Sequence, residues 1–240
     1  MRGRIVPGVL VGPGPGRGGM TPRTSVIAID GPAASGKSST AQMVADKLGY
    51  LHVDSGSLYR AATALILRGE KDAEKWTEEA VLAAAAPVEL RAARTSFYPV
   101  VNGRAIEDEI RGADVTRNVS RVAQMPRVRE WVNARVRAAA ASRNVVVDGR
   151  DMGTVVFPDA DLKIFLVAHP RERAARRLRQ RGTPTSEQLL DDETIRIRER
   201  DERDARQTVP ATDAITIDTT ALTQAEQVEQ IVTLARQTAG

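Results

Sequence analysis

The sequence predicts an α/β fold in which helices cover both faces of a parallel β-sheet. Short apolar runs rich in β-branched residues alternate along the chain with longer helix-forming stretches, as they do where helices join parallel strands. The first run, residues 25–30 (SVIAID), leads directly into a glycine-rich loop and a helix-forming stretch. The chain has 240 residues, enough for one core and a small subdomain. It contains no apolar run of the ~18 residues that a membrane helix needs.

The amino-terminal part begins with two pairs of strand and helix. Gly49 and Gly69 are helix-stop signals, and Thr77 followed by two glutamates is a helix-start signal. We therefore expect, in order, a strand over 25–30, a helix over 38–48, a strand over 50–54, a helix over 58–67 and a helix between Thr77 and Pro87.

Residues 88–111 change character. Residues 88–90 and 98–101 have the composition of strands, and the pair Asn102-Gly103 favours a tight hairpin turn. This region is therefore predicted to be a small antiparallel insertion. Helices resume over about 113–141, with an interruption at Pro126.

The carboxyl-terminal part returns to the alternation of strand and helix. Strands are expected over 144–147, 162–166 and 214–218, and helices over 170–181, 186–205 and 223–238. Residues 25–240 are therefore expected to form a single domain.

Residues 1–24 differ from the rest in being rich in glycine, proline and arginine. Four of the 35 basic residues lie there and none of the 31 acidic ones, so residues 25–240 carry 31 charges of each sign. Such a segment buries too little apolar surface to offset its ordering entropy, and we expect a disordered leader. The even charge and few aromatic residues of the remainder disfavour the alternative of a regulatory or RNA-binding protein.

Residues 31–38 match the phosphate-binding pattern G-x-x-x-x-G-K-[ST]. The strand before them and the helix after them are the context that this P-loop motif requires. In the motif, backbone N–H groups point at phosphate oxygens, the lysine meets the β- and γ-phosphates, and the hydroxyl reaches Mg²⁺. The predicted ATP-binding residues are Gly31, Pro32, Ala33, Ala34, Ser35, Gly36, Lys37, Ser38 and Ser39.

A P-loop indicates a nucleoside triphosphate but not how the protein uses it. A switch GTPase should carry an N-K-x-D motif, and none of the four asparagines is followed by lysine. Mechanical ATPases and helicases are usually larger. A small kinase remains, and its acceptor pocket is expected at the ends of the strands, where open α/β sheets bind ligands.

Two of the predicted strands end in polar residues. Ser55 and Gly56 open a helix after the strand over 50–54, and Arg60 follows one turn later. The strand over 144–147 ends in the run DGRD at 148–151. Arginines can grip phosphate with two parallel N–H groups, and Asp148 is placed to hold Mg²⁺. Each residue alone could equally be a solvated charge or a strand-end cap, but their convergence with the P-loop on one sheet edge favours a site.

Seven stretches make the chain resemble the bacterial cytidylate kinases, a family of nucleoside monophosphate kinases. They are IAIDGPAASGKSS, VDSGSLYRA, IEDEIR, VSRVAQMPRVRE, VVVDGRDMGTVVFPDADLKIFL, RERAARRL and RERDERD, and the similarity spans about residues 26–236. The patterns D-S-G-x-x-Y-R and D-G-R-D-M-G-T-V-V-F-P are specific to that family and are not expected in adenylate kinases.

The resemblance implies three parts and one reaction. The parts are a P-loop core, an insertion over about 83–142 that helps to bind the monophosphate, and a short helical lid over about 183–210. The reaction is transfer of the γ-phosphoryl group from ATP with Mg²⁺ to CMP or dCMP. It gives CDP or dCDP plus ADP and belongs to pyrimidine nucleotide metabolism.

The resemblance also implies roles for single residues. The catalytic group would be Lys37, Asp148, Arg150 and Arg200, with Mg²⁺ held by Ser38 and Asp148. Arg176 is expected to join the ATP site when the lid closes. The residues implied for CMP are Ser55, Tyr59, Arg60, Ser120, Arg129, Arg150, Asp151, Arg200, Asp204 and Arg206.

Physical chemistry supports the residues implied for the base. Asp151 and Ser120 can accept a hydrogen bond from the N4 amine of cytosine, and Arg129 can donate to N3 or O2. Uracil carries an oxygen in place of that amine, which would face a carboxylate and leave buried polar groups unpaired.

The lid departs from the family pattern R-D-x-x-D-x-x-R. Arg206, the counterpart of the last arginine, comes one residue early, and the loop that follows is shorter. This puts the geometry of Arg206 and the rate of lid closure in question.

An alternative acceptor within the kinases is UMP or a deoxynucleoside. The absence of cysteine fits a reducing compartment. We expect a cytoplasmic monomer whose partners are ATP, CMP and dCMP, with no membrane and no specific nucleic acid among them. His52 and His169 are interpreted as structural residues.

Overall fold

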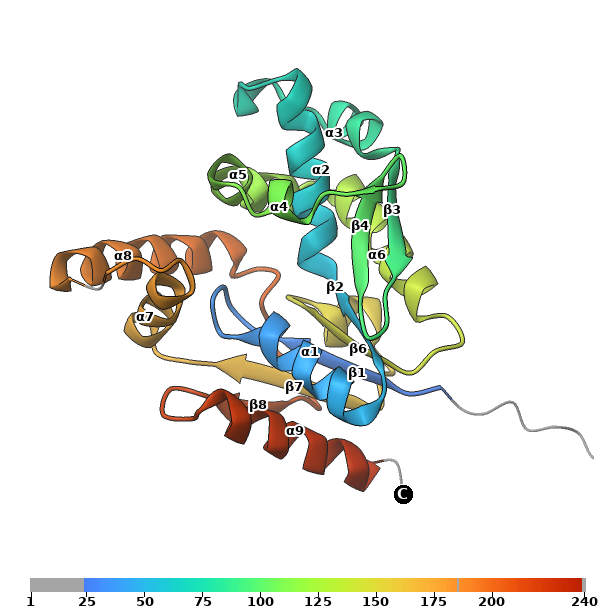
Figure 1. Ribbon diagram of the computed structural model, residues 1–240, viewed down its shortest axis with the longest axis vertical. Coiled ribbons are helices and arrows are strands. Elements are labelled where there is room, and N and C mark those ends of the chain that lie inside the picture. The colour runs from blue at the N-terminus through green and yellow to red at the C-terminus, as the bar shows by residue number, and fades with distance from the viewer. Residues whose placement is uncertain (1–23, 185, 239–240) are drawn as a thin grey trace, which may run out of the picture.

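The central feature of the computed structural model, which describes residues 24–184 and 186–238, is a five-stranded sheet (Figure 1). The strand order is β2-β6-β1-β7-β8, and every neighbouring pair is parallel. The strands are β1 (Val26–Asp30), β2 (Leu51–Asp54), β6 (Val145–Gly149), β7 (Leu162–Val167) and β8 (Ile215–Asp218). The predicted parallel α/β sheet is confirmed, whereas the predicted leader lies outside the described residues except for Thr24.

Helices cover both faces of the sheet, as predicted. The helices α1 (Lys37–Leu48) and α9 (Gln224–Thr238) pack on one face, and α2 (Ser55–Gly69) and α6 (Pro126–Ala140) pack on the other. Side chains of β1 alternate between the two layers: Ile27 and Ile29 pack with α1 and α9, while Ala28 packs with α2. Burial on both faces explains why this strand reads as a continuous apolar run.

The insertion between α2 and α6 contains the second sheet. Its order is β3 (Val88–Ala92), β4 (Phe97–Val101) and β5 (Arg104–Ala105), all antiparallel. The helices around it are α3 (Glu78–Ala85), α4 (Glu107–Ile110) and α5 (Ala113–Ala123), preceded by the short η1 (Ala73–Lys75). Asn102 and Gly103 both have positive φ, as the predicted hairpin turn requires. The turn joins β4 to β5, a two-residue strand too short to leave a sequence pattern.

Two further helices form a separate layer at one end of the sheet. They are α7 (Pro170–Gln180) and α8 (Glu187–Asp204), and the arrowhead of β7 points toward them in Figure 1. They pack on each other through a small core of Ala174, Leu178, Leu190 and Ile197. α8 also contacts α5 of the insertion, so the two regions meet above the carboxyl edge of the sheet.

Two local features differ from the prediction. Helix α2 begins at Ser55, the residue predicted to open it, three residues before the stretch 58–67 that was expected to be helical, because Asp54 caps it by accepting from the backbone N–H of Ser57 at 3.2 Å. A five-residue π-helix, η2 (Met152–Val156), follows β6 and was not predicted. Single π-turns have no hydrophobic period by which a sequence could reveal them.

In the part of the chain that the structure describes, none of the helices combines the length and the apolar character needed to span a membrane.

Candidate active site

The P-loop connects β1 to α1 at the carboxyl edge of the sheet. Gly31 has to be glycine, because a Cβ there would lie 2.2 Å from the backbone oxygen of Leu166 in β7. Ala34 and Gly36 have φ angles of 58° and 91°, and these left-handed residues curl the loop into the start of α1. The free N–H groups at the helix start are therefore presented to a phosphate.

Lys37 is the first residue of α1 and is buried. Its Nζ donates to the backbone oxygen of Pro32 at 2.7 Å. Burial, and then the charge of Arg150, lower the pKa of Lys37 well below its usual range, while Asp148 and Asp30 oppose the shift. Nucleotide phosphates would act in the same direction as those carboxylates, so the ammonium is suited to a polyanionic ligand.

Ser38 and Asp148 join the start of α1 to the end of β6. Ser38 Oγ donates to Asp148 Oδ2 at 2.6 Å, and Asp148 Oδ1 lies 2.6 Å from His52 Nε2. Burial by itself raises the pKa of the Asp148 carboxyl. The hydrogen bonds from His52 and Ser38 and the charge of Lys37 outweigh burial, so the pKa of Asp148 lies below its usual range.

The Ser38–Asp148 pair fits the donor set of a magnesium site. Mg²⁺ prefers oxygen ligands and commonly takes one or two from the protein and others from phosphates and water. Across residues 24–184 and 186–238, no cluster of three or more His, Asp or Glu side chains could hold a metal ion by itself. The pair therefore suits a metal that arrives with a nucleotide.

The ends of β2 and β6 lie against each other. Ser55 Oγ donates to the backbone oxygen of Asp148 at 2.8 Å. A Cβ on Gly149 would lie 2.6 Å from Ser55 Oγ and 2.8 Å from Met152 Cε. Only glycine at this position lets the two polar strand ends approach so closely.

Arg150 and Arg200 converge on one carboxylate. The Nε atoms of both lie 3.5 Å from Asp204 Oδ2, an ion-pair distance at which neither makes a hydrogen bond. Burial, followed by the charge of Arg150, lowers the pKa of Arg200 to about 10. Two arginine side chains therefore face a single carboxylate, and such an excess of positive charge is expected where an anion binds.

Arg60 belongs to the same basic cluster. Its Nη1 donates to the backbone oxygen of Ile110 at 3.3 Å and to Thr116 Oγ1 at 3.1 Å. Burial lowers the pKa of Arg60; Asp54 opposes this, and nearby arginines, among them Arg150, add to it. Hydrogen bonds to the insertion thus hold the Arg60 side chain in place. Its positive charge interacts with Asp54 and Arg150 at the ends of β2 and β6.

The residues predicted for base recognition gather on the side of α2 and α6. Arg129 forms an ion pair with Asp151 and donates to the backbone oxygen of Ala123 at 3.0 Å. Burial raises the pKa of Asp151 and of Tyr59, whereas Arg129 lowers both. Ser120 is buried on α5, which packs against α2 and α6, the helices that carry Tyr59 and Arg129. The three residues predicted to read the base, and Tyr59, which is predicted for CMP but not for its base, therefore come from segments that contact one another.

Buried polar atoms without a hydrogen-bond partner concentrate in this region. Among the described residues there are five such side-chain atoms, and four of them belong to predicted site residues. They are Ser35 Oγ, Tyr59 Oη, Arg150 Nε and Arg200 Nε; the fifth is Asn133 Oδ1. Because nearly all buried polar groups in proteins are paired, these four atoms mark this region as a candidate ligand site.

Three predicted residues lie apart from that group. Arg176 donates to Thr219 Oγ1 at 3.0 Å and pairs with Glu172, beside the segment that follows β8. Ser39 is exposed and accepts from Gln224 at 3.1 Å. Arg206 is exposed beyond the end of α8, while every other residue predicted for CMP is at least partly buried. Arg206 comes one residue earlier than in the family pattern, and this shift is consistent with its exposed position.

Arg173 was not predicted, and it connects the P-loop to α8. Its Nη1 donates to the backbone oxygen of Ala33 at 2.9 Å and to Asp201 Oδ1 at 3.0 Å, and its Nη2 donates to Asp201 Oδ2 at 2.5 Å. A further bond runs from Nε to the backbone oxygen of Ala168 at 3.0 Å. The RERAARRL stretch offers several arginines, and no periodicity tells which one turns inward.

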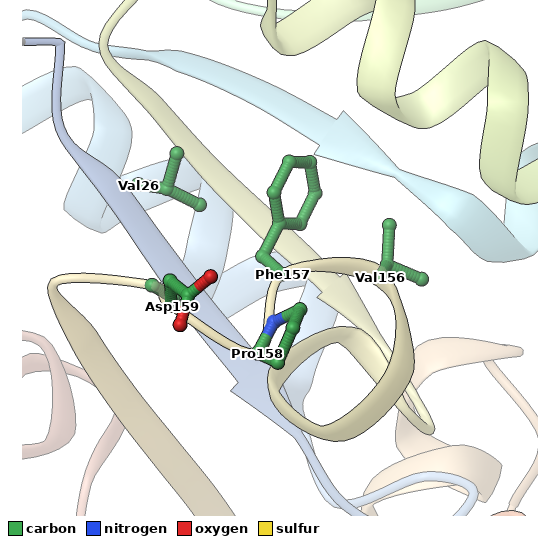
Figure 2. Close-up of a pocket in the computed structure, with 6 residues that line it drawn as sticks. Val26, Val156, Phe157, Pro158 and Asp159 are labelled. Atoms are coloured by element: carbon green, nitrogen blue, oxygen red, sulfur yellow. The ribbon is translucent and has the colours of Figure 1, made fainter.

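The pocket drawn in Figure 2 is not part of this arrangement. It has a volume of about 170 Å³ and is lined by Val26, Val156, Phe157, Pro158, Asp159 and Ala160. Val26 begins β1, whereas the P-loop follows the end of that strand, so the pocket lies at the opposite edge of the sheet.

Comparisons with known proteins match nearly the whole described chain. A family model described as cytidylate kinase matches residues 27–237. A cytidylate kinase from Oceanobacillus iheyensis is 42% identical over 86% of this chain and 91% of its own length. One from Geobacillus kaustophilus is 43% identical over 89% of this chain and 97% of its own. A gluconokinase structure from Sinorhizobium meliloti covers 90% of this chain and 96% of its own, with a TM-score of 0.47 and 18% identity, a likeness too distant to indicate function.

Proposed function

This chain belongs to the cytidylate kinase family, and we propose that it transfers the γ-phosphoryl group of ATP to CMP or dCMP, giving CDP or dCDP and ADP. The chain spans nine tenths or more of the length of the relatives named above, so the resemblance extends to both substrate sites.

One observation carries the assignment of residues to the two substrates. The unpaired buried atoms divide between the P-loop (Ser35) and segments outside it (Tyr59 on α2, Arg150 after β6 and Arg200 on α8). Two anionic ligands that meet between these groups would satisfy them from both sides. Asp148 and Lys37 lie at the junction, which supports placing the reacting phosphates there.

Phosphoryl transfer needs alignment and charge neutralisation more than covalent help. Lys37 and the backbone N–H groups of the P-loop would hold the β- and γ-phosphates. Arg60 and Arg150 would hold the acceptor phosphate in line, and Arg200 would approach from the lid. Bound through Ser38 and Asp148, Mg²⁺ would neutralise charge on the ATP phosphates.

Selection of cytosine would fall to Asp151, Arg129 and Ser120. The contact of Arg129 with Asp151 leaves a buried acceptor and a buried donor side by side. Cytosine can engage both groups, through its N4 amine and its N3 and O2 acceptors. Uracil would set an oxygen against the carboxylate, so discrimination against UMP is expected to be strong.

We further propose that the enzyme acts as a monomer in the cytoplasm, in pyrimidine nucleotide metabolism. The lack of cysteine in all 240 residues supports a reducing compartment.

A coupled assay of ADP release tests the function. ATP and Mg²⁺ are combined with CMP, dCMP, UMP, AMP or GMP as acceptor. Turnover on CMP and dCMP, with UMP far behind, is expected. Comparable turnover on UMP would leave a nucleotide kinase but remove the assignment of the base-reading residues, and no turnover on any monophosphate would contradict the proposal.

A further inference from the structure

Asp30 lies between the P-loop and the end of β6, at the centre of the carboxyl edge of the sheet. It is the last residue of β1, and it is in register with Gly149 of β6 on one side and Phe165 of β7 on the other. The side chain is buried, with 5% of the residue exposed. Nothing in the sequence pattern separates it from an ordinary strand-end residue.

Both oxygens of Asp30 bind the backbone of η2. Oδ1 accepts from the N–H of Met152 at 2.9 Å, and Oδ2 accepts from the N–H of Gly153 at 2.8 Å. These are the first two residues of η2, and N–H groups at a helix start have no partner inside the helix. Asp30 therefore caps η2 from β1, although η2 follows a different strand, β6, in the sequence.

The residue at the usual capping position of η2 is Asp151. An aspartate there normally accepts from the N–H groups of its own helix. The side chain of Asp151 makes no such bond, and its carboxylate pairs with Arg129 instead. Capping by Asp30 thus leaves the carboxylate of Asp151 available to a ligand.

Burying the carboxylate of Asp30 costs desolvation free energy, which an uncharged residue at this position would avoid. Burial raises the pKa of Asp30 to about 6, although the N–H groups of Gly153 and Met152 and the charge of Lys37 favour the ionised form. Asparagine or serine at this position would avoid the desolvation of a charge. A carboxylate, however, offers two separate acceptor oxygens, one for each of the two N–H groups.

We infer that Asp30 is a positioning residue for cytosine selectivity: it caps η2 in place of Asp151 and so holds the Asp151 carboxylate toward Arg129 and the base. The inference rests on the proposed function, because Asp151 is assigned there to the N4 amine. Asp30 touches neither substrate in this role. It acts through Asp151, whose backbone immediately precedes the two capped N–H groups.

The test is the variant Asp30→Asn, in which an amide nitrogen replaces one acceptor and opposes an N–H. With the full chain, we expect the ratio of kcat/KM for CMP to that for UMP to fall by about 10-fold. KM for CMP should rise, while KM for ATP stays within about twofold of wild type. If Asp30→Asn fails to fold, Asp30→Ser replaces it with the same expectation, since serine keeps one acceptor and opposes neither N–H.

Asp161→Asn is the matched control. Asp161 Oδ2 accepts from the N–H of Val26 at 2.9 Å, at the opposite end of the same strand. This variant should leave the CMP to UMP ratio unchanged even if it lowers Tm. In an Asp151→Asn background, Asp30→Asn should cause no further loss of selectivity, because the residue through which it acts is already neutral.

The outcomes separate the inference from the proposed function. If the wild-type protein does not prefer CMP, the proposed function is overturned. If the wild-type protein prefers CMP and Asp30→Asn keeps that preference, the inference alone is overturned. Equal increases in KM for CMP and ATP, or a further selectivity loss in the Asp151→Asn background, would likewise overturn it.

Discussion

His52 and Asp148 form a buried ion pair, in which His52 Nε2 lies 2.6 Å from Asp148 Oδ1. The other ring nitrogen, Nδ1, faces Gln42 Oε1 at 3.1 Å. The amide nitrogen of Gln42 is directed to Asp46 and Thr95, which fixes the oxygen toward the ring. Because both ring nitrogens face acceptors, this environment favours the doubly protonated imidazolium form of His52.

The pair makes stability depend on pH. Burial by itself lowers the pKa of His52, but the hydrogen bond and charge of Asp148 raise it above its ordinary value of 6.5. The stabilisation is therefore complete below about pH 6.5, where the unfolded side chain is also protonated, and is lost as the pH rises through the higher folded pKa. The loss in unfolding free energy caused by His52→Gln should be large at about pH 6 and shrink as the pH rises through the folded pKa of His52.

Urea unfolding of both proteins across that range measures the effect. His169→Gln is the matched control, because His169 is exposed and caps α7. A difference between wild type and His52→Gln that stays constant with pH would refute the ion pair.

Asp151→Asn should erode base selection and leave ATP binding intact. An amide cannot accept from N4 with both atoms, so we expect the preference for CMP over UMP to fall by about 10-fold or more. KM for ATP should stay near wild type, since Asp151 makes no contact with the P-loop backbone among the hydrogen bonds of the described residues. Tm should fall, because the substitution leaves the charge of Arg129 without its carboxylate partner. Steady-state kinetics with CMP and with UMP measure this preference. A preference unchanged from wild type would show that Asp151 does not take part in base recognition.

Arg173 should couple α8 to the P-loop. Lysine has one nitrogen and cannot bridge Ala33 and both oxygens of Asp201, so Arg173→Lys is expected to lower kcat about 10-fold. Lysine keeps the charge beside Asp201 but leaves some of these buried acceptors without a donor, so the unfolding free energy should also fall by about 1–3 kcal/mol. Single-turnover rates and urea unfolding give the two quantities.

A double-mutant cycle with Asp201→Asn isolates the contact. The control is Arg171→Lys, since Arg171 forms exposed ion pairs with Glu187 and Asp191 on the same two helices and should change little. Additive effects of Arg173→Lys and Asp201→Asn on kcat would show that the pair does not act as a unit.

Gly149→Ala should destabilise the site by overpacking. Its Cβ would press on Ser55 Oγ and on the side chain of Met152, at a cost of about 1–3 kcal/mol. Gly69→Ala is the control, because a Cβ at that helical position meets nothing within 4 Å and alanine should be neutral or stabilising. Thermal unfolding compares the two, and equal Tm values for both variants would contradict the predicted crowding.

The sequence predicted those parts of the fold and site that depend on neighbours along the chain. The P-loop and the polar strand end at 148–151 are contiguous motifs, and the strands are continuous apolar runs. Arg173 was missed because its partners, Ala33 and Asp201, lie far away in the chain. His52 is predicted to be structural and is buried, but a single histidine inside a strand carries no sign of the carboxylate that faces it from β6.

The central position of β6 between β1 and β2 constrains the order in which the strands can pair while the protein is being synthesised. Val145 of β6 pairs with Val26 of β1 on one side and with Leu51 of β2 on the other. On the ribosome, the two earliest strands therefore wait for a partner that emerges only after the whole insertion. The local antiparallel strands of the insertion can form first. The phosphate-binding loop is shaped later still, because Gly31 packs against Leu166 in β7, so a nascent chain cannot bind its nucleotide until most of the protein has been synthesised.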